Sequence, residues 1–230
     1  MPNLLLAAIP PAEQEQLAPH LETVRLEPRR FFLPAGERMA HVYFPHAGVV
    51  SFVVAMHTGT SVEVASVGRE GMLGVSVVLE ADPPPYDMVC QLRGHAARLP
   101  PAIFVDAVKE LPALRRLVLR YTLALINQLA RTAACNRLHS VEQRLARWLL
   151  LCRDRAASDD LGLTHEFLAR MLGTGRPFVT QTAQSLQEAG LIEYRRGRIR
   201  IIDVPGLEAA ACEDYRATTD EYRRLLGTAP

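Results

Sequence analysis

The 230-residue sequence is poor in cysteine and has no long apolar run. None of the four cysteines, Cys90, Cys135, Cys152 and Cys212, forms a C-x-x-C pair with another, so their spacing predicts neither a zinc site nor an iron–sulfur cluster. The apolar stretch at positions 4–9 follows no basic residue and is too short to span a bilayer, which indicates neither a signal peptide nor a membrane span. We therefore expect a cytoplasmic chain with reduced thiols, no bound metal and no membrane partner.

Catalytic signatures are missing as well. The sequence contains no G-x-S-x-G, no H-E-x-x-H, no phosphate-binding loop and no dinucleotide fingerprint. Without a nucleophile motif or a phosphate cradle, we expect neither an enzyme nor a cofactor. Four histidines do not stand at ligand spacing from another histidine or cysteine and are interpreted as surface or turn residues. They are His41, His46, His57 and His95.

The composition is that of a globular chain long enough for two small domains, with 49% hydrophobic and 22% charged residues. The net charge of +1 hides an uneven distribution. Residues 1–110 contain 8 basic and 12 acidic side chains, residues 111–202 contain 15 and 7, and residues 203–230 contain 3 and 6. The basic middle of the chain is therefore where a polyanion would bind.

The first hundred residues show short strand patterns, preceded by a helical pattern at 11–21. Gly and Pro separate β-branched and aromatic runs, as is typical of an antiparallel sandwich or roll. We expect the stretch Pro45–Gly48 to be a turn between two of the strands. Strands first and helices later predict an α+β protein of two domains. The runs are Phe31–Leu33, His41–Phe44, Val49–Met56 and Ser61–Val67, the last two joined by a turn at 57–60.

The segment 163–192 has the pattern of a helix-turn-helix. Thr164 stands where an N-cap is expected, and the apolar residues of the first helix follow as one stripe. Pro177 falls in the first turn of the second helix, and Gly190 follows its last residue. The first stripe is Phe167, Leu168, Met171 and Leu172, and the inward stripe of the second helix is Val179, Ala183 and Leu186.

The outward face of the second helix is rich in side chains that make directional hydrogen bonds. Such side chains suit the edges of DNA bases better than a solvated helix face would require. The face comprises Arg176, Thr180, Gln181, Gln184, Gln187 and Glu188. Two short strand patterns around Gly197 follow and predict a β-hairpin with four arginines. Such a hairpin is a wing, and we expect Arg195, Arg196 and Arg198 to meet phosphates.

These residues resemble the winged helix-turn-helix of the bacterial Crp/Fnr family of transcription regulators. The resemblance rests on 163–164, 172–173, Arg176, Val179, Leu186 and 188–192. It implies that Arg176 is a principal base reader. Thr164, Thr180, Gln181 and Gln184 are the other DNA contacts that we expect from the helix-turn-helix. The family often has Glu and Arg at the positions of Pro177 and Gln181, so the family's usual half-site is not implied.

The N-terminal half is similar to the β-roll (jelly roll) effector domain of the same family. The similarity rests on Pro34–Glu37, Tyr43–Pro45 with Gly48, and Val67–Gly74, whose glycines match the turns of the phosphate-binding cassette. A cyclic nucleotide requires a Glu for its ribose and an Arg for its phosphate, and neither stands in 75–78 or in the loop 82–87. We expect a cassette kept as a scaffold, with Arg69 and Glu70 at a solvated hairpin tip.

A long helical pattern begins at Pro112 and has a seam with heptad spacing. The resemblance implies a dimerisation helix, so we expect a homodimer through Leu114, Val118, Tyr121 and Leu125; the alternative is burial against the chain's own β domain. A capping box at Ser140–Gln143 predicts a new helix and a hinge near 138–139. The expected domains are 1–110, 111–138 and 139–230, with one last helix at about 207–226.

The expected function is a DNA-binding transcription regulator whose effector is unknown. Double-stranded DNA, a second copy of the chain and a small-molecule effector are the expected partners, and the resemblance allows RNA polymerase as another. We expect an effector pocket between the β-roll and the long helix, too apolar for cyclic AMP, lined by Met72, Gly74, Val75, Val77, Leu125, Leu129 and Ala130. A collapsed, filled pocket, with DNA binding controlled by protein level alone, is the alternative. The alternative is a β-roll regulatory subunit that binds a small ligand and acts on a protein partner.

Overall fold

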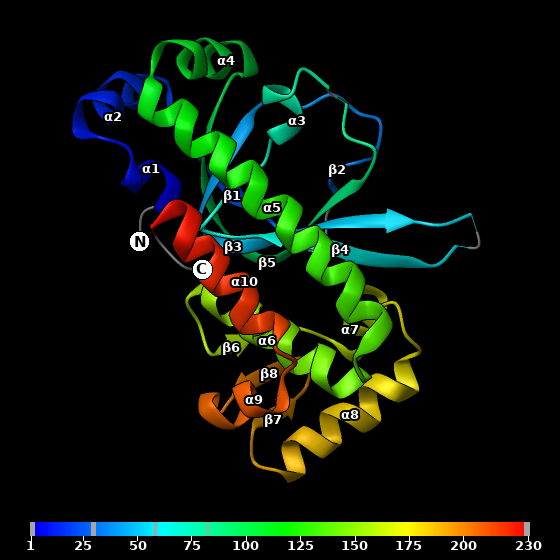
Figure 1. The fold of residues 1–230 in the computed structure, drawn as a ribbon. Coiled ribbons are helices and arrows are strands. Elements are labelled where there is room, and N and C mark those ends of the chain that lie inside the picture. Colours follow the sequence, from blue (N-terminus) through cyan, green and yellow to red (C-terminus); the bar gives the residue numbers. More distant parts are fainter. Residues whose placement is uncertain (1–2, 29–30, 58, 82, 228–230) are drawn as a thin grey trace.

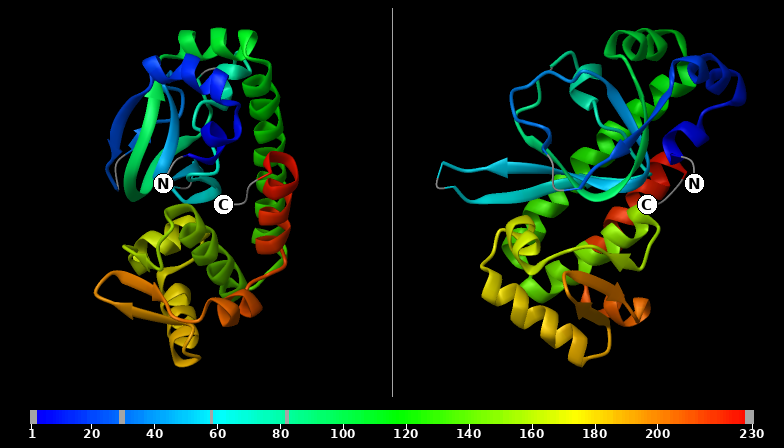
Figure 2. Two further views of the ribbon diagram at one scale, coloured as in Figure 1. Left: turned by 90° about the vertical axis from the view of Figure 1, so that its left-hand side faces the viewer. Right: turned by 180° about the vertical axis from the view of Figure 1, so that it is seen from behind.

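The computed structural model describes residues 3–28, 31–57, 59–81 and 83–227. An antiparallel sheet forms the N-terminal part, a long helix crosses it, and a mainly helical part with a small sheet follows (Figure 1). This is the predicted α+β arrangement. Turned views show the long helix along one side of the sheet and the C-terminal part at its far end (Figure 2). In the described part of the chain, no helix is both long and apolar enough to cross a membrane.

The N-terminal part begins with short helices and continues as a five-stranded sheet. The strands follow the order β1-β5-β3-β4, with β2 also paired to β5. Sequence patterns predicted β2 and β4 but gave no separate indication of α1, β1 or β5. The elements are α1 (Leu4–Ala8), α2 (Pro11–Leu17), η1 (Ala18–His20), β1 (Glu22–Leu26), β2 (Phe31–Leu33), β3 (Val42–Ala55), β4 (Ser61–Val67), α3 (Val75–Val78) and β5 (Asp87–Leu99).

Strand β3 corrects the prediction of two strands separated by a turn at 45–48. It runs unbroken through these residues, and its pairing with β5 shifts register between Pro45 and Ala47 and again before Val49. Bulges of this kind accommodate a proline inside a paired strand. Gly48 has φ +90°, and a Cβ there would lie 2.7 Å from the carbonyl oxygen of Leu92. Thr58 and Asp82, in two of the predicted loops, lie outside the described residues.

Helices α4 (Pro101–Glu110) and α5 (Pro112–Leu138) lead out of the sheet, and α5 places the predicted seam against the chain's own core. Leu114, Val118, Tyr121 and Leu125 are all buried there together with residues of the sheet. The assignment of these residues to a dimer seam is therefore wrong. The heptad spacing was read correctly, but the sheet takes the place of the second helix.

The predicted effector pocket is filled by the same packing. Met72, Val75, Val77 and Leu125 are at most 8% exposed. The hydroxyl of Tyr121 donates to the carbonyl oxygen of Met72 over 2.9 Å. Gly71 permits this approach, because a Cβ there would lie 2.5 Å from that hydroxyl oxygen. Side chains that the sequence assigned to a pocket lining therefore form core.

Gly74 adds the second close approach at this turn: at φ +124°, a Cβ on it would lie 2.9 Å from Val42. Leu129 is half-buried and packs against the same core. Gly74 and Leu129, the remaining residues of the predicted lining, therefore also belong to packed structure.

The C-terminal part is built on α6 (Val141–Ala156), whose N-terminus carries the predicted capping box of Ser140 and Gln143. Its sheet has the order β6-β8-β7, and the two-residue β6 was not predicted. The expected last helix is two helices separated at 211–213. The remaining elements are β6 (Asp160–Leu161), α7 (His165–Leu172), α8 (Arg176–Glu188), β7 (Ile192–Arg195), β8 (Arg198–Ile201), α9 (Val204–Ala210) and α10 (Asp214–Leu226).

Helix α10 returns along α5, so the C-terminal segment contributes to both cores (Figures 1 and 2). Tyr222, Leu225 and Leu226 belong to the core of the N-terminal part. Conversely, Val49 and Leu92 of the sheet pack in the core around α6. The two parts therefore share a packed boundary and are not joined by the hinge alone.

A completely buried ion pair crosses this boundary and corrects the expectation for Glu70. Arg155 of α6 donates from Nε to Oε1 of Glu70 over 2.8 Å, and both side chains are 0% exposed. Its other nitrogens donate to Ser66 Oγ at 2.7 Å and Gln128 Oε1 at 2.9 Å. A Cβ on Gly68 would lie 2.4 Å from that of Arg155. The cassette turn at 68–71 is therefore a docking point for α6 and not a solvated tip.

Arg155→Met is expected to lower the free energy of unfolding by about 3–5 kcal/mol, because Glu70 would keep a buried charge without its ion-pair partner. Chemical denaturation measures the change. Arg153→Ala on the same helix is the control and should cost less than about 1 kcal/mol, since that side chain is 32% exposed and its pairs lie near the surface. Equal losses in the two variants would contradict the role given to Arg155.

Candidate nucleic-acid interface

The predicted helix-turn-helix is present as α7 and α8. The hydroxyl oxygen of Thr164 caps α7 by accepting from the N–H of Phe167 over 3.2 Å. Gly173 ends α7 in the left-handed region at φ 58°, which a glycine adopts without strain. The inward stripes are buried as predicted, apart from Phe167, which is half-buried. Two short helices are thus fixed at a sharp turn by caps and by one shared core.

The outward face of α8 is open to solvent at its first residue and along its middle. Arg176, Gln181 and Gln184 are exposed. Phe178, which the sequence analysis did not single out, is 61% exposed and lies one position after the proline of the first turn. Its signal was available: it follows Pro177 and lies outside the inward stripe. An exposed aromatic ring in the same first turn as Arg176 gives this end of α8 both a charged and an apolar group.

Two residues of the predicted outward face, Thr180 and Gln187, make bonds inside the domain. The hydroxyl of Thr180 lies 3.0 Å from Nδ1 of His165, and the side-chain oxygen of Gln187 accepts from the N–H of Tyr194 over 2.7 Å. The hydroxyl of Thr164 serves as the cap described above. These side chains hold the helices and the hairpin together, so they are less available for an external partner than Arg176, Gln181 and Gln184.

The predicted wing is the hairpin β7–β8. Arg196 and Gly197 both have positive φ at its tip, as a two-residue hairpin turn with right-handed strand twist requires. Arg195, Arg196 and Arg198 are exposed, and Arg198 lies 3.5 Å from Asp160 in an exposed ion pair. Because a pair at the surface contributes little, Arg198 can exchange this partner for a phosphate.

His165 connects all three pieces of this surface. It begins α7, contacts Thr180 of α8, and stacks on Tyr194 of β7 with ring centroids 3.9 Å apart. Burial, and after it the charge of Arg176, lowers the pKa of His165 below its ordinary value. The sequence analysis missed His165, because its partners are 15 and 29 positions away and only the fold brings them together.

The β3–β4 hairpin reaches the turn between the two helices. A Cβ on Gly173 would lie 3.0 Å from the side chain of Val62. A groove runs between them, lined from the hairpin by Met56 and Thr60 and from the helix-turn-helix by Arg170 and Arg176. The sheet therefore borders the surface that contains Arg176.

Stability should fall in mild acid because of His165. Its pKa is lowered in the folded chain, so the unfolded chain takes up the proton first, at about pH 6.5. The stabilisation is present above that pH and is lost as the pH falls toward the folded pKa. Between about pH 7.5 and 5.5, thermal melting of the wild type should therefore drop further than that of His165→Gln. His57→Gln, in the exposed hairpin turn, is the control and should melt like the wild type; identical profiles for all three would contradict the assignment.

Comparison with known proteins agrees with this geometry. Residues 143–210 match the model of the Crp-like helix-turn-helix domain. None of the curated proteins matches the chain. Solved structures share the fold across both parts, at identities that carry no information on ligands.

Three structures illustrate the shared fold. A CRP-family transcriptional regulator from Thermus thermophilus is 20% identical with TM-score 0.66, over 82% of this chain and 96% of its own. FixK2 from Bradyrhizobium japonicum is 14% identical with TM-score 0.69, over 84% and 98%. The c-di-GMP-responsive global regulator CLP from Xanthomonas campestris is 15% identical with TM-score 0.65, over 84% and 99%. Residues 143–210 are therefore a Crp-like helix-turn-helix domain, in a chain that shares the two-domain fold of these regulators.

Proposed function

We propose that this chain works as a homodimer that places α8 in the major groove of duplex DNA. The observation that carries the proposal is the exposed N-terminal end of α8, with Arg176 and Phe178, in the same small domain as the arginine-rich wing. The first residues of a recognition helix are those that reach base edges in helix-turn-helix proteins.

The exposed side chains of α8 differ in which DNA base each can contact. Arg176 can donate two hydrogen bonds to O6 and N7 of a guanine. Gln181 and Gln184 present amides that match N6 and N7 of adenine, and the ring of Phe178 suits the methyl group of thymine. From the wing, Arg195, Arg196 and Arg198 would neutralise phosphates, which adds affinity without sequence preference.

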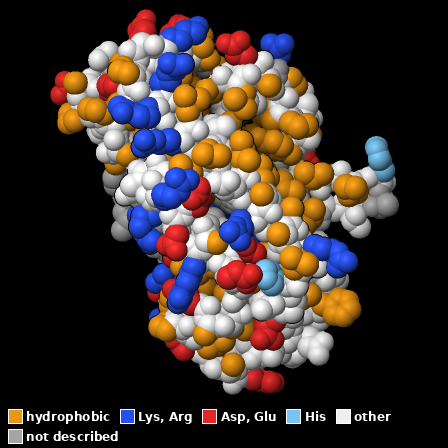
Figure 3. Space-filling view, viewed as in Figure 1, with side chains coloured by type: hydrophobic (Ala, Val, Ile, Leu, Met, Phe, Trp, Pro, Cys, Tyr) orange, Lys and Arg blue, Asp and Glu red, His pale blue; other side chains and the backbone are white. Residues whose placement is uncertain are grey.

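The dimer is proposed to form through the outer face of α5. Leu119, Leu123 and Ile126 are 51%, 44% and 54% exposed, and Ala130 and Ala133 continue their 4-3-4-3 spacing. Apolar side chains gather on the surface that α5 crosses (Figure 3). This spacing is that of a two-helix seam, and a second copy of the same helix satisfies it. The two recognition helices would then meet half-sites of an inverted repeat about 34 Å apart.

A cyclic nucleotide is not the proposed effector. The cassette turn binds Arg155 through Glu70, and Tyr121 fills the space between this turn and α5. A phosphate placed there would lose its hydration, and the buried cation Arg155 is already paired with Glu70. Any effector is therefore an uncharged or apolar molecule that opens this packing, or DNA binding follows protein level alone. Calorimetry with cyclic AMP and cyclic GMP tests this point, and saturable micromolar binding of either would overturn it.

Arg176→Ala should weaken binding to the preferred duplex by about 1–3 kcal/mol and relax the preference at one base pair, because a bidentate contact to guanine is lost. The preferred duplex comes from selection out of a random pool. Arg115→Ala is the control. Arg115 is exposed in the first turn of α5, far along the chain from the helix-turn-helix, so this variant should bind like the wild type.

The triple change Arg195→Ala, Arg196→Ala and Arg198→Ala should behave differently from Arg176→Ala. It should weaken binding to all duplexes alike and reduce the slope of log affinity against log salt by about three units.

If Arg176→Ala lost equal affinity on specific and random duplex, α8 would not be the reading helix. A protein partner in place of DNA would leave no salt-dependent duplex binding in the wild type.

Leu123→Asp should convert the dimer into monomers, because a charge at the centre of the seam would be desolvated on association. Sedimentation gives the mass, and affinity for an inverted repeat should fall with it. Leu79→Asp is the matched control, since Leu79 is 56% exposed and is the C-cap of α3, outside the proposed seam. A dimeric Leu123→Asp protein would show that the contact is made elsewhere.

A further inference from the structure

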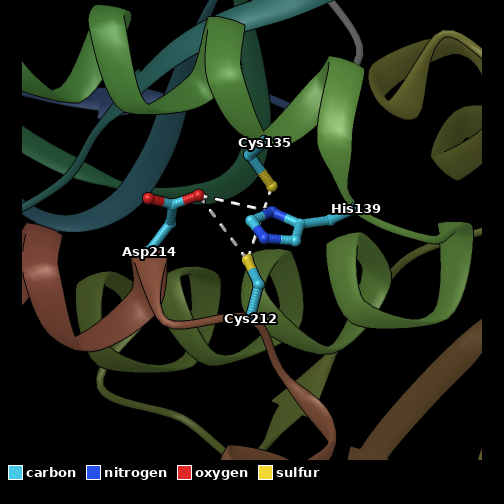
Figure 4. A group of neighbouring side chains, drawn as sticks. All are labelled: Cys135, His139, Cys212 and Asp214. Carbon is cyan, nitrogen blue, oxygen red and sulfur yellow. Dashed lines mark hydrogen bonds and ion pairs between the residues drawn. The ribbon is translucent and has the colours of Figure 1, made fainter.

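Four side chains with atoms that bind transition metals meet at the end of α5 (Figure 4). Cys135 lies in the last turn of α5 and His139 is its C-cap, whereas Cys212 precedes α10 and Asp214 is its first residue. One donor atom from each lies within 4.8 Å of those of the other three. We call these four residues the thiol cluster.

The distances in the thiol cluster are close to those around a tetrahedral zinc ion. The two sulfurs are 3.5 Å apart, Nδ1 of His139 is 3.4 Å from Oδ2 of Asp214, and that oxygen is 3.9 Å from the Cys212 sulfur. With Zn–S near 2.3 Å and Zn–N and Zn–O near 2.1 Å, tetrahedral angles place these pairs about 3.8, 3.4 and 3.6 Å apart. These three pairs match to within about 0.3 Å, and the remaining pairs of donor atoms lie no more than 4.8 Å apart.

The neighbours of the thiol cluster aim its donor atoms inward. Nε2 of His139 lies 3.2 Å from a carboxylate oxygen of Glu213, which favours the proton on Nε2 and leaves the lone pair on Nδ1. Nδ1 is buried and makes no hydrogen bond among the described residues, and its neighbour is Oδ2 of Asp214 at 3.4 Å. Arg131 lies 3.2 Å from Oδ1 of Asp214, so Oδ2 is the oxygen that faces the sulfurs. Hydrogen bonds of this kind orient the ligands of metal sites.

The donor atoms are buried, so a carboxylate and ionised thiols at this place would need a bound cation to balance them. Both cysteines and Asp214 are at most 4% exposed. Two buried thiols alone would pack as small apolar groups, but that interpretation does not account for the carboxylate and the imidazole that meet the two sulfurs within 4.8 Å.

We propose that the thiol cluster binds one thiophilic divalent cation of the zinc type and that this ion fastens the start of α10 to the end of α5. Thiolate and imidazole ligands together select such ions over magnesium or calcium. The sequence analysis expected no metal because it looked for close spacing, whereas these two cysteines are 77 positions apart. The ion would fix the joint where the helix with the proposed dimer face meets the segment that follows the wing.

Titration of the whole reduced chain with Co²⁺, after treatment with a chelator, tests the proposal. The expected result is thiolate-to-cobalt charge-transfer absorption together with the visible bands of tetrahedral Co²⁺, saturating at one ion per chain and abolished by Zn²⁺. Zn²⁺ should also raise the melting temperature. Cys135→Ala and Cys212→Ala should each weaken Co²⁺ binding by about 100-fold or more.

Cys90→Ala and Cys152→Ala are the matched controls, because these thiols are buried and lie outside the thiol cluster. They should keep the spectrum and the stoichiometry. If a ligand variant does not fold by circular dichroism, the wild-type cobalt spectrum decides. A wild type without charge-transfer absorption overturns the proposal. So does a reduced chain that takes up no metal but forms a Cys135–Cys212 disulfide on oxidation.

Discussion

The buried guanidinium of Arg155 is the interaction on which the arrangement of the two parts depends. An unpaired charge at such depth would be strongly destabilising, so its partners must be held in place around it. Glu70, Ser66 and Gln128 supply them from the cassette turn, β4 and α5. The hydroxyl of Tyr222 on α10 also donates to Gln128. One cation therefore fixes where α6, and with it the helix-turn-helix, lies relative to the sheet.

A second buried network next to it strengthens the same boundary. Glu63 of β4 accepts from Trp148 of α6 over 3.0 Å and from Ser51 over 2.7 Å, and Gln91 donates to it as well. Burial raises the pKa of Glu63 above its ordinary value despite these bonds. Trp148 was predicted to be core of the C-terminal part, and it is buried there. The hydrogen bond from its indole N–H to Glu63 adds a directional polar contact to the apolar packing at the boundary.

Helix α5 shows how far periodicity alone can go. It has two apolar stripes at heptad spacing, one through Tyr121 and Leu125 and another through Leu123 and Ile126. Both stripes satisfy the same pattern, so the sequence does not say which one packs on the chain's own sheet. The first does, and it fills the space expected to hold an effector. The thiol cluster and His165 escaped prediction for a related reason: their partners meet only after α10 folds back and the wing closes on α7.

The sequence by itself determined the local elements that carry the family signature. Caps, turn glycines and apolar stripes specified α7, α8, the wing and the start of α6, because these signals act within a few residues of one another. Tertiary structure decided everything that depends on a choice of partner: the continuous β3, the buried face of α5, the burial of Glu70 and the two-part C-terminal helix. These features depend on the free energy of packing and of charge pairing between segments far apart in sequence, and a local sequence pattern does not report those energies.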